Sequence, residues 1–291
     1  MPSGQFPEDN RQSQQPQYGQ PYTGQFHQQQ PQYGQPLAQP QYAAASGAFG
    51  TSGATGTATY TTNLAYSYEQ AARVSITRAY GEMTLGLLVT AAVAVLTNAT
   101  GLLSAFVSAT GTLGWIGLAI AQVGLAIFLG ARITRISTGT ARAMFYAYAA
   151  LMGFTLSSIF AVYSLGNIGI CLALCAGFFF ALTMIGLTTK VNMLKAGPIL
   201  IVGLIVLIVA ELLISMFFPG DAMLQIVSAI GLLLFAGMTV YDAQSTRAIF
   251  NQYQSQGPEM IKKVSVLCAL NLYLDFVNMF LYLLQLFGDR E

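Results

Sequence analysis

The chain has 291 residues, of which 54% are hydrophobic and 8% are charged, and its formal net charge is +1. A soluble globular domain carries about 25% charged residues, so this composition excludes a chain whose whole surface faces water. The near-zero net charge also gives no reason to expect a nucleic-acid partner.

The first 65 residues are polar and of low complexity. The heptapeptide QPQYGQP occurs at 15–21 and again at 30–36. Such a composition cannot bury enough apolar surface to offset chain entropy. We therefore predict a disordered cytoplasmic tail over 1–65, followed by a membrane domain over 66–291. The tail would act either as a solvated tether or as a segment that associates weakly with itself or binds a partner through its spaced tyrosines.

The rest of the chain contains apolar runs long enough to cross a bilayer, which takes about 20 residues per helix. Seven such runs predict an all-α membrane protein, a seven-transmembrane helix bundle, with spans at 83–107, 113–130, 143–165, 168–188, 198–218, 223–241 and 264–287.

Basic residues test this count, because they gather in cytoplasmic loops. The predicted loops at 108–112, 166–167 and 219–222 contain no Lys or Arg. The segments before the first span and between the other spans carry ten basic residues: Arg73, Arg78, Arg132, Arg135, Arg142, Lys190, Lys195, Arg247, Lys262 and Lys263. This alternation predicts a multi-pass protein with a cytoplasmic N-terminus and an outer C-terminus. Together with the tail composition, it favours a bacterial plasma membrane.

Asp275 is an ionisable residue in the middle of the last predicted span. It shares one helix face with Asn271, Asn278 and Tyr282, at spacings of four, three and four residues. A polar stripe of this kind is costly against lipid, so it should face other helices and make the last span central. The stripe is either a structural hydrogen-bond ladder or the surroundings of a carboxylate that responds to protons or cations.

Two further carboxylates lie in the spans. Asp242 ends the sixth predicted span on the cytoplasmic side, so it is able to reach Asp275 in the same half of the bundle. Neighbouring carboxylates share a proton, because two adjacent negative charges repel each other. Glu211, toward the outer side of the fifth span, is either a structural carboxylate or part of an ion path.

The remaining polar and small residues receive mostly structural interpretations. Arg78 and Glu82 are four residues apart and are expected to form a local helical pair. Cys171, Cys175 and Cys268 are expected to be buried small side chains. Small-residue pairs that would permit close helix packing are Gly114 with Gly117 and Gly231 with Gly237.

Enzymatic chemistry is not expected. The one histidine, His27, lies in the tail, and the spans contain no phosphate loop, catalytic triad, or thiol or imidazole metal cluster. We therefore predict no cofactor. Calcium prefers oxygen ligands, which carboxylates, amides and carbonyls of the bundle can supply.

Two motifs then carry a resemblance to a known family. The segments VYDAQ at 240–244 and ALNLYLDFVNMFL at 269–281 resemble the Bax inhibitor family, which includes bacterial YccA-type members. The resemblance covers about residues 70–288. It implies a seven-helix bundle around a central last helix and a pH-sensitive calcium leak, with Asp242 and Asp275 as the pH-sensing pair and as contacts for calcium. It also implies an arginine partner for Asp242, assigned to Arg135 with Arg132 as its competitor.

The leading hypothesis is a pH-gated calcium or cation leak channel, with Asn271, Asn278 and Glu211 in its polar network or ion path. The alternative is a membrane-embedded modulator of a membrane protease or other membrane complex, in which the aspartates are structural. A proton-coupled transporter is a third interpretation, and it would move a solute uphill.

Overall fold

The computed structural model describes residues 55–217 and 220–289, with side chains described from residue 76 onward except at 215 and 221. Residues 1–54, most of the predicted tail, lie outside the described residues. The first helix begins at Thr55, inside the segment for which the sequence predicts disorder.

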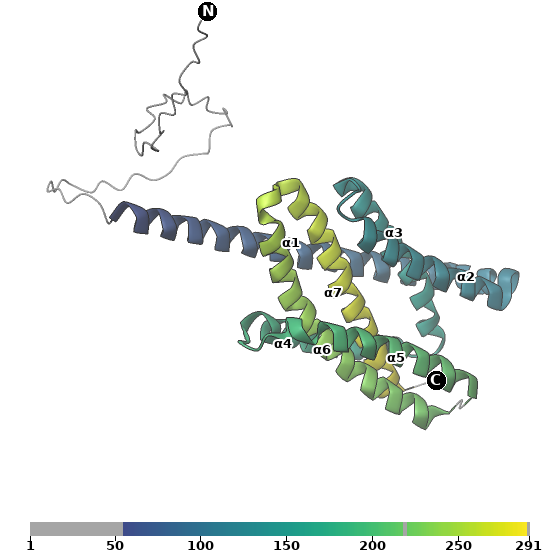
Figure 1. Cartoon of the computed structure of the whole chain (residues 1–291). Helices are drawn as coiled ribbons and strands as arrows, with labels where there is room; N and C mark the ends of the chain where they lie inside the picture. Colours follow the sequence, from purple (N-terminus) through teal and green to yellow (C-terminus); the bar gives the residue numbers. More distant parts are fainter. Residues whose placement is uncertain (1–54, 218–219, 290–291) are drawn as a thin grey trace, which may run out of the picture. The chain divides into compact units, whose positions relative to one another are not determined.

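Seven long α-helices make up this part of the chain (Figure 1). All seven are long and apolar enough to cross a membrane, which confirms the predicted number of spans. They are α1 (Thr55–Thr100), α2 (Leu102–Arg132), α3 (Thr138–Leu156), α4 (Leu165–Thr188), α5 (Gly197–Phe217), α6 (Asp221–Tyr253) and α7 (Pro258–Phe287). Three short 3-10 helices, η1 (Ser157–Ala161), η2 (Met193–Ala196) and η3 (Gln254–Gln256), lie in the connections.

The boundary between the first two helices differs from the predicted one. The sequence predicted a first span that continues to residue 107, but α1 ends before Gly101, whose φ of 65° only glycine adopts at no steric cost. The predicted loop at 108–112 lies within α2, which is kinked at Gly111 (φ 56°, ψ −146°). The sequence stays apolar on both sides of Gly101 and Gly111, so hydrophobicity alone does not locate the end of α1 or the kink in α2.

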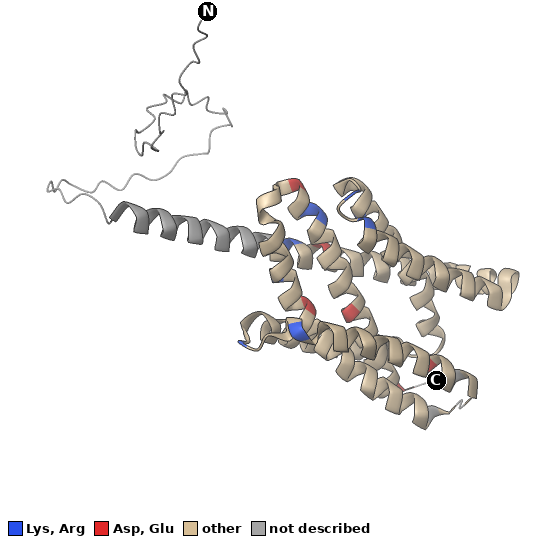
Figure 2. Cartoon of the chain, in the orientation of Figure 1, with Lys and Arg blue, Asp and Glu red and all other residues tan. Residues whose placement is uncertain are grey.

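The outer helices present apolar side chains that require a bilayer. Most large hydrophobic residues of α2 and α5 are exposed on the surface of the described chain, and charged residues are sparse along the helices (Figure 2). Exposed apolar area of this extent is incompatible with water. The helices therefore span a membrane, as the composition predicted.

α7 lies at the centre of the bundle. In the most apolar stretch of α7, 72% of the residues are buried, whereas the corresponding share is at most 39% in any other span. It packs against α1, α3, α4 and α6. The central position predicted for the last helix is confirmed. Of the polar stripe, Asp275 and Tyr282 are buried, whereas Asn271 and Asn278 are only partly buried.

Close helix approach depends on different glycines from those chosen from the sequence. Gly153 of α3 lies against the backbone carbonyl of Thr90 in α1, and Gly231 of α6 lies against the ring of Tyr282. Gly117, by contrast, has open space around it, and a Cβ at Gly114 would meet only its own helix. The packing role predicted for Gly231 is confirmed, whereas that predicted for Gly114 and Gly117 is wrong because α2 is peripheral.

Two of the basic connections lie on the same side of the bundle. Lys263 Nζ of α7 is 3.5 Å from the Thr134 carbonyl oxygen, and Thr138 at the start of α3 donates a 3.2 Å hydrogen bond to Glu259. The α2–α3 and α6–α7 connections are therefore neighbours. Their shared side agrees with the charge alternation, while the orientation of the chain in the membrane stays a prediction.

Candidate functional site

The carboxyl groups of Asp242 and Asp275 lie close together between α6 and α7. The α6–α7 hairpin positions them: Gly257, at φ 90°, and Pro258 turn the chain and start α7 alongside α6. Asp242 is 6% exposed and Asp275 is 1% exposed. Two carboxyl groups at close range form a hydrogen bond with each other only while one of them carries a proton.

Asp242 lies inside its helix rather than at the end of it. The sequence ended the sixth span at residue 241, because polar residues follow, but α6 continues to Tyr253. Asp242 and Thr246 are both buried within this extension. These polar residues form a buried polar layer between α6 and α7. Hydrophobicity alone does not indicate that the helix continues through such a layer.

Hydroxyl groups from two other helices surround the carboxyl pair. Tyr80 of α1 and Thr183 of α4 face each other beside Asp275, without completing a hydrogen bond. Three buried oxygens here, Tyr80 Oη, Thr183 Oγ1 and Asp275 Oδ2, have no hydrogen-bond partner in the described part of the chain. Buried oxygens in that state attract a water molecule or a cation.

The arginine assigned to Asp242 is elsewhere. Arg135 and its competitor Arg132 are both exposed near the end of α2. Within the described residues, neither forms an ion pair with Asp242. The partnership of Asp242 with Arg135 therefore stays a prediction.

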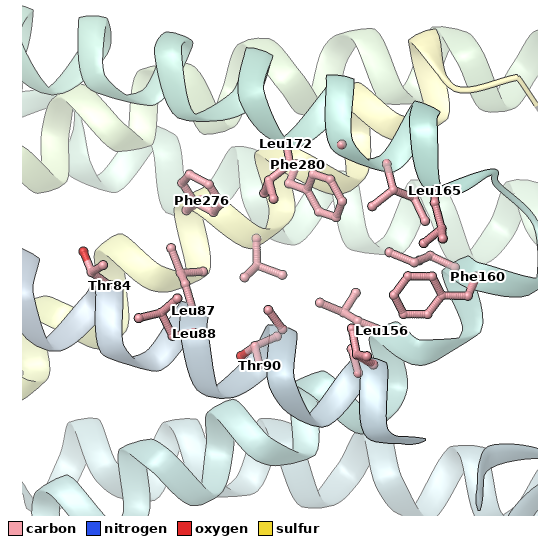
Figure 3. A pocket seen from close by; sticks show the side chains of 17 residues that line it. Thr84, Leu87, Leu88, Thr90, Leu156, Phe160, Leu165, Leu172, Phe276 and Phe280 are labelled. Atoms are coloured by element: carbon pink, nitrogen blue, oxygen red, sulfur yellow. The ribbon is translucent and has the colours of Figure 1, made fainter. Parts of the chain in front are cut away.

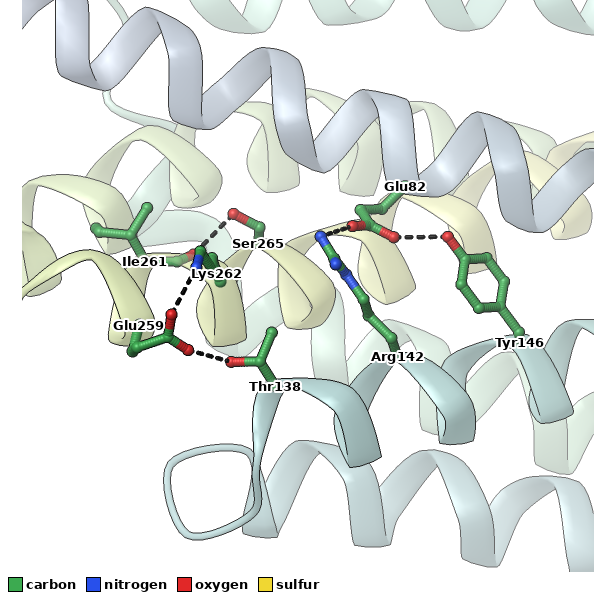
Figure 4. Close-up of polar contacts among 8 residues, drawn as sticks. All are labelled: Glu82, Thr138, Arg142, Tyr146, Glu259, Ile261, Lys262 and Ser265. Carbon is green, nitrogen blue, oxygen red and sulfur yellow. Dashed lines mark hydrogen bonds and ion pairs between the residues drawn. The ribbon is translucent and has the colours of Figure 1, made fainter.

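An ion pair with a buried carboxylate, which the sequence did not indicate, joins α1 to α3 (Figure 4). Glu82 Oε1 is 2.5 Å from Arg142 Nη2, and Glu82 Oε2 accepts a 2.6 Å hydrogen bond from Tyr146 Oη. Glu82 thus pairs across helices, not with Arg78 along its own helix. The spacing of Arg142 and Tyr146, four residues apart, was the available signal, because it puts both on one face of α3.

We expect this ion pair to stabilise the packing of α1 on α3. Its partners differ in exposure, at 8% for the Glu82 side chain and 40% for that of Arg142. Arg142→Met strands a buried carboxylate and should cost about 1–3 kcal/mol, less than the roughly 3–5 kcal/mol of a fully buried pair because water screens the arginine. A double-mutant cycle with Glu82→Gln, measured by unfolding in detergent, should give a favourable coupling energy. Additive effects of the two substitutions would contradict this prediction.

The polar stripe of α7 divides between two neighbours. Tyr282 Oη donates a 2.6 Å hydrogen bond to Glu211 Oε1 of α5, whereas Asp275 faces Asp242 of α6. Asn278 donates to the Leu274 carbonyl of its own helix at 2.8 Å. Asn271 is half-buried, one turn before Asp275. The structure therefore places Glu211 with Tyr282 and apart from the carboxyl pair.

A hydroxyl contact between α1 and α7 also went undetected in the sequence. Thr90 Oγ1 lies 2.6 Å from Tyr273 Oη and 2.9 Å from the Ala149 carbonyl oxygen. Single hydroxyls in apolar spans are common, so no sequence signal distinguishes these two. All three cysteines are buried free thiols, and Cys175 Sγ lies 3.6 Å from the Phe276 carbonyl oxygen.

Comparison with known proteins places this arrangement in context. A family described as "Inhibitor of apoptosis-promoting Bax1" matches residues 72–291, which include all seven membrane-spanning segments and both aspartates. The match therefore covers all the membrane-spanning segments and leaves out the whole of the predicted tail, residues 1–65.

Several bacterial proteins are similar over the same region. The inner membrane protein YbhL of Escherichia coli strain K12 is 39% identical over 213 residues, which are 73% of this chain and 90% of YbhL. An uncharacterized protein of Borreliella burgdorferi is 34% identical over 216 residues, 74% of this chain and 92% of the relative. The uncharacterized protein RP147 of Rickettsia prowazekii is 30% identical over 231 residues, 79% and 96% of the two chains.

Proposed function

Because the chain belongs to the Bax inhibitor family of multi-pass membrane proteins, we propose that it is a pH-sensitive calcium leak channel gated by Asp242 and Asp275. The observation that carries this proposal is the close approach of the two buried carboxyl groups. We infer that they share a proton, and the resulting hydrogen bond joins the central helix α7 to α6 only while that proton is held. A change of protonation therefore acts directly on the contact between two helices.

The sign of the pH response follows from that proton. At low pH, the pair keeps its proton and holds α6 against α7, which closes the cytoplasmic half of the bundle. Raising the pH removes the proton and leaves two adjacent negative charges with little water around them, which repel strongly. The repulsion moves α6 away from α7, so calcium flux increases with pH.

Calcium is a suitable ion because the surroundings of the pair are rich in oxygen. Two carboxyl groups and the hydroxyls of Tyr80 and Thr183 meet there, and calcium binds to oxygen ligands. Within the described residues, no group of three or more His, Cys, Asp or Glu side chains gathers at one place. Resident binding of calcium needs about six to eight oxygen ligands. The two carboxyl groups and two hydroxyls therefore favour brief contact with a passing cation.

The proposed setting is a bacterial plasma membrane with the N-terminus in the cytoplasm. The basic connections on one side of the bundle support this orientation, and the described inner membrane protein of E. coli supports the location. Asp242 and Asp275 then control the cytoplasmic half, and Glu211 lies along the outer part of the path.

Calcium flux into liposomes that contain the purified full-length protein tests the proposal. The flux should exceed that of empty liposomes and increase from about pH 6 to pH 8, by up to about tenfold per pH unit for one titrating proton. Deletion of residues 1–54 should leave it unchanged. A flux no greater than that of empty liposomes would favour a modulator of a membrane protease or other complex, and uphill accumulation of a solute would indicate a transporter.

A further inference from the structure

An apolar cavity of about 480 Å³ lies beside the central helix, away from the carboxyl pair. Its two walls are α1 and α4, and its floor is the face of α7 that carries Phe276, Val277 and Phe280 (Figure 3). The 3-10 helix η1 closes one end, where Phe160 lines the cavity. The cavity therefore lies between transmembrane helices, at the level of the bilayer.

The lining offers nothing to a polar ligand. Apart from Thr84 and Thr90, every side chain that lines the cavity is apolar. Both hydroxyls are already used: Thr84 donates to the Tyr80 carbonyl at 2.8 Å, and Thr90 contacts Tyr273 and Ala149. An ion or polar solute would lose its hydration without compensation here. The ligand that fits is a hydrocarbon.

The open side of the cavity faces the surface that contacts lipid. Leu88 and Val95 of α1, and Leu165 and Leu172 of α4, line the cavity and are 44–74% exposed. In a protein that spans the membrane, exposed leucine and valine side chains at this depth contact lipid. The cavity is therefore continuous with the bilayer, whose acyl chains reach it without crossing water.

The dimensions also select an acyl chain over a protein helix. A helix is at least about 10 Å wide with its side chains, so one turn of about 5.4 Å fills roughly 420 Å³. A cavity of about 480 Å³ would accept little more than a single turn. An extended hydrocarbon chain is one methylene wide, so a cavity of this volume between α1 and α4 accepts a segment of it.

We propose that this cavity binds one acyl chain of a bilayer phospholipid, whose headgroup stays at the membrane surface. The bound chain fills space that would otherwise leave the walls without contacts on one side. Its contacts on α7 begin at Phe276, the residue after Asp275. The proposal concerns binding alone, and it does not depend on whether the protein conducts calcium.

Two glycines of α4 provide a matched pair of variants. A Cβ at Gly169 meets no atom within 4 Å, and Gly169 lines the cavity, so Gly169→Phe adds a ring at the cavity wall from a position that accepts a side chain. Gly177, eight residues later on the same helix, also has open space around its Cβ but does not line the cavity. Gly177→Phe is therefore the control for adding a phenylalanine to α4.

Tryptophan fluorescence reports on the cavity, because Trp115 is the one tryptophan of the chain. The cavity reporter is the double variant Trp115→Phe with Phe160→Trp, and the probe is phosphatidylglycerol with brominated acyl chains, titrated into full-length protein in detergent micelles. We expect saturable quenching at low lipid content. Gly169→Phe should raise the half-quenching concentration on the order of tenfold or more, which is about 1.4 kcal/mol of binding, and Gly177→Phe should leave it unchanged.

A second reporter separates binding from general contact with lipid. Ile120→Trp, in the Trp115→Phe chain, lies on the exposed side of α2 outside the cavity and should be quenched only in proportion to lipid content. Proportional quenching of the cavity reporter as well, or saturation that Gly169→Phe does not shift, would overturn the proposal. Quenching by a brominated free fatty acid, but not by the phospholipid, would also overturn it. Gly169→Leu replaces Gly169→Phe if that variant does not fold.

Discussion

Replacing Asp275 with asparagine is expected to leave calcium flux low and nearly independent of pH. The asparagine amide donates a hydrogen bond to the Asp242 carboxylate at any pH, so it imitates the protonated acid without titrating. The wild-type dependence, up to about tenfold per pH unit for one proton, should fall to almost none. The measurement is calcium flux in liposomes from about pH 6 to pH 8.

A second carboxylate in the spans provides the control for this substitution. Glu211 lies on α5 and accepts a hydrogen bond from Tyr282, apart from the carboxyl pair. Glu211→Gln removes a membrane carboxylate in the same conservative way and should preserve the pH dependence. If Asp275→Asn keeps the wild-type response, or if Glu211→Gln abolishes it equally, then the pair is not the gate.

Gly153→Ala is expected to destabilise the packing of α1 on α3 strongly. The new Cβ would collide with the backbone carbonyl of Thr90 and with Val93. A backbone atom cannot rotate away, so α1 and α3 must separate, at a cost of about 1–3 kcal/mol. Separation also disturbs the contact of Thr90 with Tyr273 on the central helix. Thermal unfolding in detergent measures the effect.

Gly117→Ala is the matched control, because it makes the same chemical change in α2. Its Cβ would meet nothing within 4 Å, and alanine favours a helix over glycine by up to about 1 kcal/mol. The unfolding temperature should therefore stay the same or rise slightly. Equal losses of stability at residues 117 and 153 would mean that the close approach of α3 to α1 has no special importance.

The parts of the fold that were predicted correctly depend on simple physical signals. Seven apolar runs predict seven spans, because each must cover the hydrocarbon thickness. The central position of α7 follows from the spacing of Asn271, Asp275, Asn278 and Tyr282, since such a stripe is costly in lipid. These signals lie within single segments of the chain, and the sequence therefore contains them without reference to the other helices.

The unpredicted features depend on which helices meet. Glu82 has a potential partner on its own helix at Arg78, and only the packing of α1 on α3 pairs it with Arg142. Gly117 resembles Gly153 as a small residue in a span, but one lies on a peripheral helix and the other against a backbone carbonyl. A single sequence contains no information on neighbours of this kind.

The candidate site falls between these two cases. The positions of Asp242 and Asp275 in their spans allow a contact between them without establishing it. The structure brings the two carboxyl groups together. The hydroxyls of Tyr80 and Thr183 were not foreseen, because tyrosine and threonine are ordinary residues in apolar spans. They join the site only because α1 and α4 both pack against α7.

A pH titration followed by infrared spectroscopy tests most directly whether Asp242 and Asp275 share a proton, on which the proposed gating depends. The C=O stretch of a protonated carboxyl group is distinct from the bands of a carboxylate. The wild-type protein should show a protonated carboxyl band that disappears over the pH range in which calcium flux increases, and Asp275→Asn should lack that band. A pH-dependent band that is the same in wild type and Asp275→Asn would contradict the account.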